Sequence, residues 1–131
     1  GFGKDGKGHV STGSGALDNQ PYGFNTRFED APGTNPEELI AAAHASCFTM
    51  ALAFQLADKG HSDGTIETTC KVTLEKDGEG FKVSKSALSV TGGGDGLDKA
   101  TFEECAQTAK ENCPLSKLLD TEITLETTFN G

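Results

Sequence analysis

The sequence is poor in positive charge. It has 11 Lys and Arg residues against 20 Asp and Glu residues, which gives a formal net charge of -9 at pH 7. Nucleic-acid phosphates are bound mainly through Lys and Arg, so this balance argues against a nucleic-acid partner. The same excess of negative charge disfavours binding to an anionic membrane surface.

Hydrophobic residues are also few, at 34% of the 131 residues, and glycine occupies 17 positions. This length is enough for one domain with a modest core, and no repeat or linker divides the chain, so we expect a single domain over residues 1–131. A lone copy would have little to bury besides one apolar helix. The shortage favours a second protein surface that covers this helix.

Neither a signal-peptide pattern nor a Cys-x-x-C motif is present, although a start at Gly1 rather than at Met is compatible with trimming. The missing motif argues against a thioredoxin-like disulfide reductase. Four cysteines in a chain of this length are sparse for a secreted disulfide framework. We therefore expect a cytoplasmic protein with reduced or redox-active thiols.

The central feature is an apolar stretch over residues 34–60, TNPEELIAAAHASCFTMALAFQLADKG. Asn35 and Glu38 form a capping-box pattern at its start, and Gly60 predicts a left-handed stop at its end. Because the helix is apolar almost all round, we expect it to be buried. Its many alanines and its capped ends argue against a membrane span.

The other elements follow from alternation, caps and turn residues. Strands are predicted over residues 9–16, 22–29, 66–74, 81–90 and 121–129, with a hairpin turn at 77–80 and a second helix over 98–111. A change of parity within 81–90 predicts a bulge near 84–86. Strands, a helix, strands, a helix and a strand in this order indicate an α+β domain.

Two cysteines occupy positions that suit chemistry. Cys47 lies in the long helix, and Cys113 begins a helical turn, CPLSKLL, where free N–H groups favour a negatively charged sulfur. A buried cysteine can equally be a small hydrophobic residue, and placement alone leaves both interpretations open. Arg27 and Glu37 also have two interpretations. Arg27 is either a surface residue or a guanidinium that activates a thiol, and Glu37 is either part of the helix cap or the carboxylate that fixes this guanidinium.

TNPEELIAAAHASCFTMAL followed by NCPLSKLL resembles the OsmC/Ohr family, the osmotically inducible protein C and organic hydroperoxide resistance proteins. QPYGFNTRFE is similar to the OsmC branch, and the resemblance covers residues 8–128. It implies antiparallel sheets wrapped around long central helices in an intertwined homodimer. One departure is a strand that family members usually carry before the region of residues 1–8, which is missing here.

The resemblance implies a peroxiredoxin-like enzyme that reduces organic hydroperoxides to alcohols in oxidative and osmotic stress defence. Cys47 would be the peroxidatic thiol, Cys113 the resolving thiol that joins it in a disulfide, and Arg27 with Glu37 the activating pair. No bound cofactor or metal is expected, and the reductant would be an external dithiol such as a lipoyl group. The alternative is a non-catalytic, stress-related protein of the same fold that binds small molecules.

Further residues have weaker assignments. Cys70 and Cys105 match no family motif and are interpreted as structural. His44 lies three residues before Cys47 and is a candidate base for its thiol. However, Arg27 would already supply the activation, and a thiolate needs no base. An apolar wall beside the thiols would favour organic peroxides, and its candidates are Phe48, Met50, Leu115 and Leu118.

Glu37 and Cys47 are ten residues apart in one predicted helix. At about 1.5 Å per residue this is roughly 15 Å along the axis, too far for Arg27 to serve both. No Pro or Gly lies between them to break the helix. Antiparallel pairing of two such helices about a two-fold axis would bring Glu37 of one chain toward Cys47 of the other, so we predict a homodimer with two composite sites.

Overall fold

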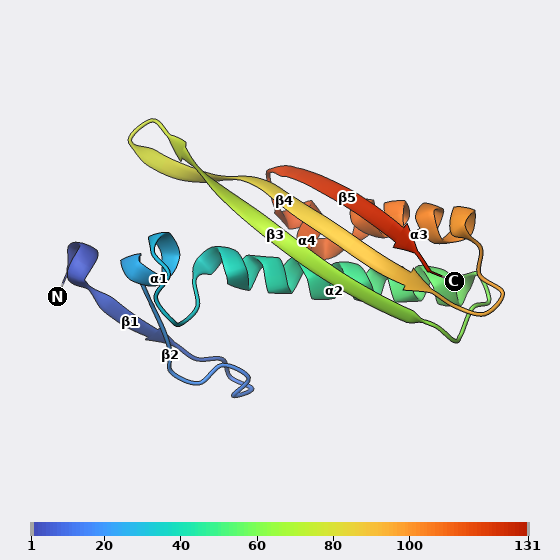
Figure 1. The fold of residues 1–131 in the computed structure, drawn as a ribbon, viewed down its shortest axis with the longest axis horizontal. Coiled ribbons are helices and arrows are strands. Elements are labelled where there is room, and N and C mark those ends of the chain that lie inside the picture. Colours follow the sequence, from blue (N-terminus) through green and yellow to red (C-terminus); the bar gives the residue numbers. More distant parts are fainter. Residues whose placement is uncertain (1, 131) are drawn as a thin grey trace. The chain divides into compact units, whose positions relative to one another are not determined.

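The computed structural model describes residues 2–130, and the chain divides after Leu39 into two compact units. The first begins with a short 3-10 helix, η1 (Gly3–Asp5), followed by the strands β1 (Lys7–Val10) and β2 (Gln20–Gly23) (Figure 1). The two strands pair antiparallel in a small sheet of their own.

The segment predicted as a strand over residues 22–29 is instead the end of β2 and a short helix, α1 (Phe24–Phe28). Thr26 explains the difference. Its hydroxyl accepts a hydrogen bond from the Gly23 N–H at 2.8 Å and donates to the Gly23 carbonyl at 3.0 Å. This local side-chain bonding closes a helical turn, which competes with the extended conformation that alternation suggested. Arg27 therefore lies on a helix.

The first predicted strand, over residues 9–16, is also corrected. β1 ends at Val10, and the chain turns back through a loop closed by the Thr12 N–H, which donates to the Leu17 carbonyl at 2.9 Å. Serine, threonine and glycine fill this loop, and their local hydrogen bonds favour turns over strands.

Helix α2 (Pro36–Asp58) has the predicted start and end. The Asn35 side chain accepts from the Glu38 N–H at 2.8 Å, as an N-cap should. The Glu38 carboxylate accepts from the Thr34 hydroxyl at 2.8 Å, so the second half of the capping box is replaced by this bond. At the other end Gly60 has a φ of 90°, which confirms the left-handed stop.

The second unit contains a three-stranded sheet in the order β3 (Thr65–Asp77), β4 (Gly80–Gly93) and β5 (Glu122–Phe129). β3 and β4 form the predicted hairpin, in which Gly78 supplies a φ of 63°. β5 pairs parallel to β4, whereas we expected antiparallel sheets. The alternation of apolar and polar residues in β5 is the same for parallel and antiparallel pairing. In this chain, two helices between β4 and β5 return the chain to the same end of the sheet, so the pairing is parallel.

The predicted bulge is confirmed. Thr73 pairs with Lys85 and Leu74 pairs with Val83, so Ser84 is an extra residue in β4. The extra residue changes the parity of β4. Beyond it, Ser86, Leu88 and Val90 are all buried on the same face of the sheet.

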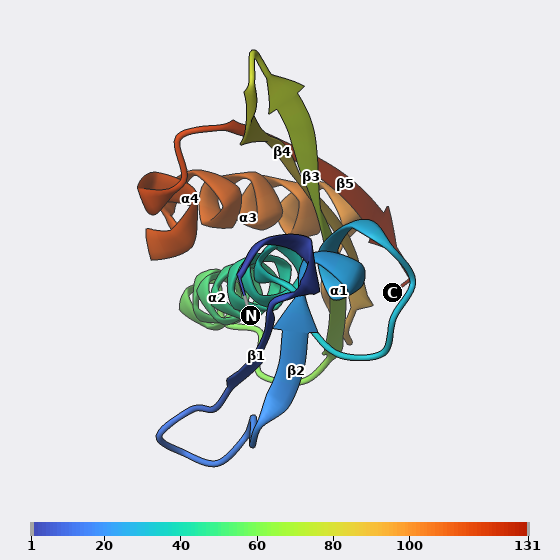
Figure 2. The ribbon, with the colours of Figure 1, turned by 90° about the vertical axis from the view of Figure 1, so that its left-hand side faces the viewer.

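The connecting helices are α3 (Lys99–Asn112) and α4 (Pro114–Leu118). Asp98 caps α3 by accepting from the Thr101 N–H at 2.7 Å, as predicted. Figure 2 shows α2 and α3 on one face of the three-stranded sheet. The core between these layers consists of Phe48, Leu52, Leu56, Leu88, Val90, Phe102, Cys105, Ala106, Ala109 and Cys113.

The expectation that α2 is buried on all sides is wrong for the single chain. Ala42, Ser46, Met50 and Phe54, four residues apart, form an exposed stripe along the helix, and the last two side chains are 61% and 71% exposed. The sheet and α3 lie on the other side of the helix. Four-residue spacing puts these side chains on one exposed face of the helix.

By length and composition α2 could cross a membrane, since an 18-residue window has a mean hydropathy of 1.6 with 22% of it buried inside the chain. Its neighbour argues otherwise. β3 exposes Glu67, Thr69 and Lys71 along its outer face, and an open sheet of this kind leaves backbone groups without partners in hydrocarbon.

Candidate active site

Arg27 and Glu37 form a bidentate ion pair in the first unit. The Arg27 Nε donates to Glu37 Oε1 and its Nη2 donates to Oε2, each at 2.9 Å. The side chains are 36% and 13% exposed, so the carboxylate is largely shielded while the guanidinium remains accessible. A guanidinium has more N–H donors than the two used here, so it can hold Glu37 and still bind another group.

Asn35 holds the two elements that carry this pair. Its side-chain amide donates to the Thr26 carbonyl of α1 at 3.3 Å, and its carbonyl oxygen caps α2. The Arg27 guanidinium also lies 5.6 Å from the centre of the Phe28 ring. The pair is therefore positioned by fixed contacts within its own unit.

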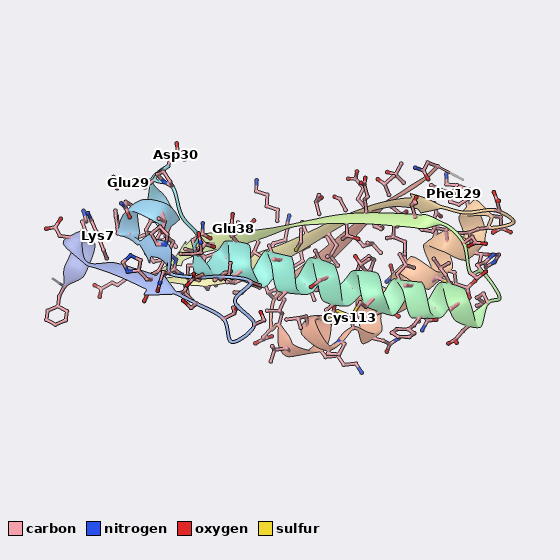
Figure 3. The ribbon with its side chains drawn as sticks, turned by 90° about the horizontal axis from the view of Figure 1, so that it is seen from below. Lys7, Glu29, Asp30, Glu38, Cys113 and Phe129 are labelled. Carbon is pink, nitrogen blue, oxygen red and sulfur yellow. The ribbon has the colours of Figure 1, made fainter. Side chains whose placement is uncertain are left out.

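Cys47 and Cys113 come together in the second unit. Both are free thiols; Cys47 is half-buried on α2, and Cys113 is fully buried just before α4. Cys47 packs against the core cluster that contains Cys113, Cys113 acts directly on the Cys47 thiol, and Cys113 lies beside α2 (Figure 3). The second unit thus joins the two cysteines that the sequence singled out.

Burial is the main influence on the Cys47 thiol, and it raises the pKa of Cys47 above its ordinary value. A hydrogen bond from the Leu115 backbone N–H lowers the pKa of Cys47. The neighbouring Cys113 raises the pKa further, through its hydrogen bond and its charge when ionised. Within one chain, the environment of Cys47 therefore favours the protonated thiol at neutral pH.

Cys113 is held by the turn that it begins. Its sulfur accepts from the Ser116 N–H at 3.4 Å and lies 3.3 Å from the Ser116 hydroxyl. Pro114 follows it at the first position of α4, where a missing N–H costs nothing. The sulfur is therefore fixed at the start of the helical turn that also directs the Leu115 N–H at Cys47.

The four predicted site residues thus form two pairs, one in each unit. Helix α2 is unbroken from Pro36 to Asp58, so it has no kink that would fold Glu37 back onto Cys47.

His44 has partners that the sequence did not indicate. It is fully buried, and its ring nitrogens lie 2.6 Å from the Ser86 hydroxyl and 2.9 Å from the Ser116 hydroxyl. Both nitrogens are therefore engaged by serines and do not face Cys47. Since these serines are 42 and 72 residues away in sequence, only the fold could reveal them.

The other two cysteines are packed in the second unit. Cys105 is 1% exposed in the core, and Cys70 is half-buried with its sulfur 3.2 Å from the Ser86 hydroxyl. Burial raises the pKa of both thiols, which keeps them protonated and weakly nucleophilic.

The proposed apolar wall is only partly formed. Phe48 is fully buried in the core and cannot face a substrate, whereas Met50 and Leu118 are exposed and Leu115 is half-buried beside Cys47. Within residues 2–130, no group of three or more His, Cys, Asp or Glu side chains is arranged to hold a metal ion.

Three comparisons relate the chain to known proteins. It is 53% identical to Peroxiredoxin OsmC of Escherichia coli over 94% of this chain and 86% of that protein. It is 32% identical to Organic hydroperoxide resistance protein OhrB of Bacillus subtilis over 84% of this chain and 79% of that protein. The crystal structure of OhrB superposes with a TM-score of 0.70 at 27% identity, over 98% of this chain and 93% of that one.

The model of the OsmC-like protein family matches residues 28–128. Glu37, Cys47 and Cys113 lie inside this range, and Arg27 directly precedes it. The sequence resemblance is therefore confirmed over most of the chain, together with the mixed α+β fold. This chain belongs to the OsmC-like protein family.

Proposed function

We propose that this protein is a thiol peroxidase that reduces organic hydroperoxides to alcohols in oxidative and osmotic stress defence. The observation that carries the proposal is the neighbouring pair of free thiols, Cys47 and Cys113, in a chain 53% identical to a protein named Peroxiredoxin OsmC. The similarity to a protein named for organic hydroperoxide resistance supports the organic class of peroxide.

The reaction begins at Cys47. Its thiolate attacks the terminal oxygen of the hydroperoxide, the O–O bond breaks, and the departing alkoxide takes a proton and leaves as the alcohol. Cys47 is then a sulfenic acid. Cys113 attacks its sulfur, an S–S bond replaces the S–O bond, and the hydroxide leaves as water. The Leu115 N–H stabilises negative charge on Cys47 in the first step.

The disulfide must be reduced by a second thiol in every cycle. Cys113 is fully buried while Cys47 is half-buried, so an incoming thiolate reaches Cys47 and expels Cys113. A dithiol such as a lipoyl group can then close its own disulfide and release Cys47. This cycle requires a reducing compartment, which is why we place the protein in the cytoplasm.

One equivalent of cumene hydroperoxide is expected to produce an intramolecular Cys47–Cys113 disulfide, because the two thiols are neighbours in the second unit. Intact mass should fall by two hydrogens, and peptide mapping should identify the crosslinked peptides. Cys105→Ser is the matched control, since this buried core thiol has no part in the reaction. A crosslink between Cys70 and Cys105, or slow and unselective oxidation of all four thiols, would favour the non-catalytic alternative.

The first step also needs a cation near the reacting sulfur and the developing alkoxide. The groups that influence the pKa of Cys47 are its burial, Leu115 and Cys113, and no cation among the described residues of the same chain acts on it. Arg27 is the only arginine in the sequence and its guanidinium is accessible. We therefore propose that the Arg27–Glu37 pair of a second copy completes the site.

The exposed stripe of α2 suits such an arrangement. In an antiparallel pair of α2 helices, Glu37 of one copy lies opposite Cys47 of the other when the two-fold axis passes Ala42, which is halfway between them. Ala42 is exposed and lies in a run of alanines, whose small side chains permit close approach. The same contact would cover part of the apolar surface that the single chain exposes.

Mixing Arg27→Ala protein with Cys47→Ser protein is expected to restore activity when the subunits exchange. Each heterodimer contains one intact site, so an equal mixture should reach about a quarter of the wild-type rate. Peroxide reduction, measured after refolding the two variants together, provides the readout. The control mixture, Cys47→Ser with Cys113→Ser, should stay inactive because both thiols of one pair come from one chain. If heterodimers form without activity, the site is not shared.

A further inference from the structure

His44 is the centre of a buried polar chain that the peroxidase cycle above does not use. The ring has no exposed surface, and both of its nitrogens are hydrogen-bonded to serine hydroxyls, Ser86 of β4 at 2.6 Å and Ser116 of α4 at 2.9 Å. Burying an imidazole between apolar layers is costly, and the cost is offset only when every polar atom has a partner. No buried side-chain nitrogen or oxygen among the described residues lacks one.

Each serine in turn contacts a thiol. The Ser116 hydroxyl lies 3.3 Å from the Cys113 sulfur, and the Ser86 hydroxyl lies 3.2 Å from the Cys70 sulfur. A continuous chain of side chains therefore runs from Cys113 through Ser116, His44 and Ser86 to Cys70. All five residues belong to the second unit, and Cys113 is the thiol assigned to resolution.

One arrangement of the protons gives every group of this chain a partner. In it, Ser86 donates to the Cys70 sulfur and accepts from the N–H at Nδ1 of His44, because a hydroxyl has one proton. Nε2 of His44 then accepts from the Ser116 hydroxyl. Ser116 is left with an acceptor that faces the Cys113 thiol.

We propose that Ser116 and His44 form a proton relay for the resolving step, in which Ser116 takes the proton of Cys113 and passes its own to His44. Ser86 and Cys70 hold the ring in the tautomer that can accept it. The proposal rests on the proposed function, because it assigns a role within the reaction of Cys113 with the Cys47 sulfenic acid. His44 acts through Ser116 and is a positioning residue in this scheme.

The step balances without a further reactant. As the Cys113 sulfur attacks Cys47, its electron pair forms the S–S bond and the S–O bond breaks with its own pair. The thiol proton moves to Ser116 Oγ while the Ser116 proton moves to His44 Nε2. The proton held by His44 balances the hydroxide released from Cys47, and its return to that hydroxide gives one water and restores the neutral ring, so the net products are the disulfide and one water.

The surroundings of His44 suit a proton acceptor. Burial lowers its pKa from the ordinary value, so the ring is neutral at neutral pH. The groups facing it are Ser86 of β4 with Cys70 of β3 behind it, and Ser116 of α4 with Cys113 behind it. Burial is the one cause of the shift, and no charged side chain of the described residues contributes to it.

His44→Gln tests the relay, because an amide can accept from Ser116 and donate to Ser86 but is not a base. Single-turnover mixing with cumene hydroperoxide, followed by acid quenching and intact mass, separates the two steps, since sulfenic acid and disulfide differ by one water. Formation of the sulfenic acid should keep its rate. Its conversion to the disulfide should slow about 10²-fold, the lower end for general acid–base catalysis. His61→Gln, the same change at a histidine outside the chain of hydrogen bonds, should alter neither step.

A second pair of variants addresses the relay without touching the buried ring. Ser116→Ala should slow conversion to the disulfide as His44→Gln does, and Ser116→Thr should restore it because the hydroxyl returns. The pH profile separates relay from packing. Wild-type conversion should be level above the lowered pKa of His44, whereas in His44→Gln it should rise with pH, because Cys113 must lose its proton to water.

The outcomes test the proposed function and the proton relay separately. If the wild-type protein forms no Cys47–Cys113 disulfide, the proposed function fails. If the disulfide forms in the wild type and equally fast in His44→Gln or Ser116→Ala, the relay is overturned while the proposed function stands. A slower conversion with an unchanged level pH profile would also overturn the relay, because it would show that the ring only supports the structure.

Discussion

Cys47→Ser is expected to abolish the reduction of cumene hydroperoxide by dihydrolipoamide. A serine hydroxyl is not ionised near neutral pH and is a far weaker nucleophile toward the peroxide oxygen than a thiolate, so no oxidised intermediate forms. Steady-state assays of the two proteins side by side measure the effect. The serine is close in size to the cysteine it replaces, and Cys47 is only half-buried, so we expect the variant to fold.

Cys113→Ser separates the two roles. This variant should still permit one attack on peroxide, and the sulfenic acid left on Cys47 should over-oxidise when peroxide is in excess. A reagent that traps sulfenic acids should label Cys47 in it. Labelling of Cys113 in the Cys47→Ser protein, with a normal burst of peroxide consumption, would reverse the assignment of the thiols.

Arg27→Ala is expected to reduce the rate of Cys47 oxidation about 10²- to 10³-fold, the loss typical for one donor to a developing oxyanion. In the proposed dimer, removing the cation also removes an influence that would lower the pKa of Cys47. The reactive species is the thiolate, so the rise of the rate with pH should move to higher pH in this variant. Stopped-flow measurements of Cys47 oxidation across a pH series give both quantities.

Arg27→Lys should recover only part of the rate, because an ammonium cannot bond both carboxylate oxygens of Glu37 and still present the same donors. Arg27 is the only arginine of the chain, so no other guanidinium can replace it. Lys4→Ala is the matched control, since it removes a cation from the same unit but away from Glu37. Near wild-type rates for Arg27→Ala would return Arg27 to the role of a surface residue.

Elements specified by short-range chemistry could be predicted from the sequence. The N-caps at Asn35 and Asp98 depend on a side chain reaching an N–H three residues away, which sequence spacing encodes directly. The stop at Gly60 and the hairpin at Gly78 follow from positive φ angles that glycine tolerates. The bulge at Ser84 followed from a change of parity that only an extra residue can accommodate.

Features that depend on distant partners were not encoded in this way. The direction of β5 relative to β4 depends on the path of α3 and α4, and alternation in the strand is the same for either direction. The apolar residues of α2 indicated burial, but they do not say whether the cover comes from the same chain. At α1, the local hydrogen bonds of the Thr26 hydroxyl favour a short helix of five residues, although the alternation of aromatic and polar residues favours a strand.

Some residues of the candidate site could be predicted from the sequence, and others could not. Arg27, Glu37, Cys47 and Cys113 were identified through motifs of a known family, and the structure forms an ion pair from two of them and a thiol pair from the other two. The partners of His44 lie on β4 and α4, and serine is too common for its spacing to mark a contact. Only the fold could place them around the ring.

The parallel pairing of β5 with β4 also affects the order in which the nascent chain can fold. Leu88 and Leu125 are neighbours in this pairing, 37 residues apart, so the two strands cannot join until the crossover has been made and has closed. Cys113 lies in that crossover, whereas Cys47 lies in an earlier helix whose hydrogen bonds are local. During synthesis from the N-terminus, Cys47 therefore emerges before the thiol that protects it. We expect newly made chains to be more vulnerable to irreversible oxidation than the folded protein.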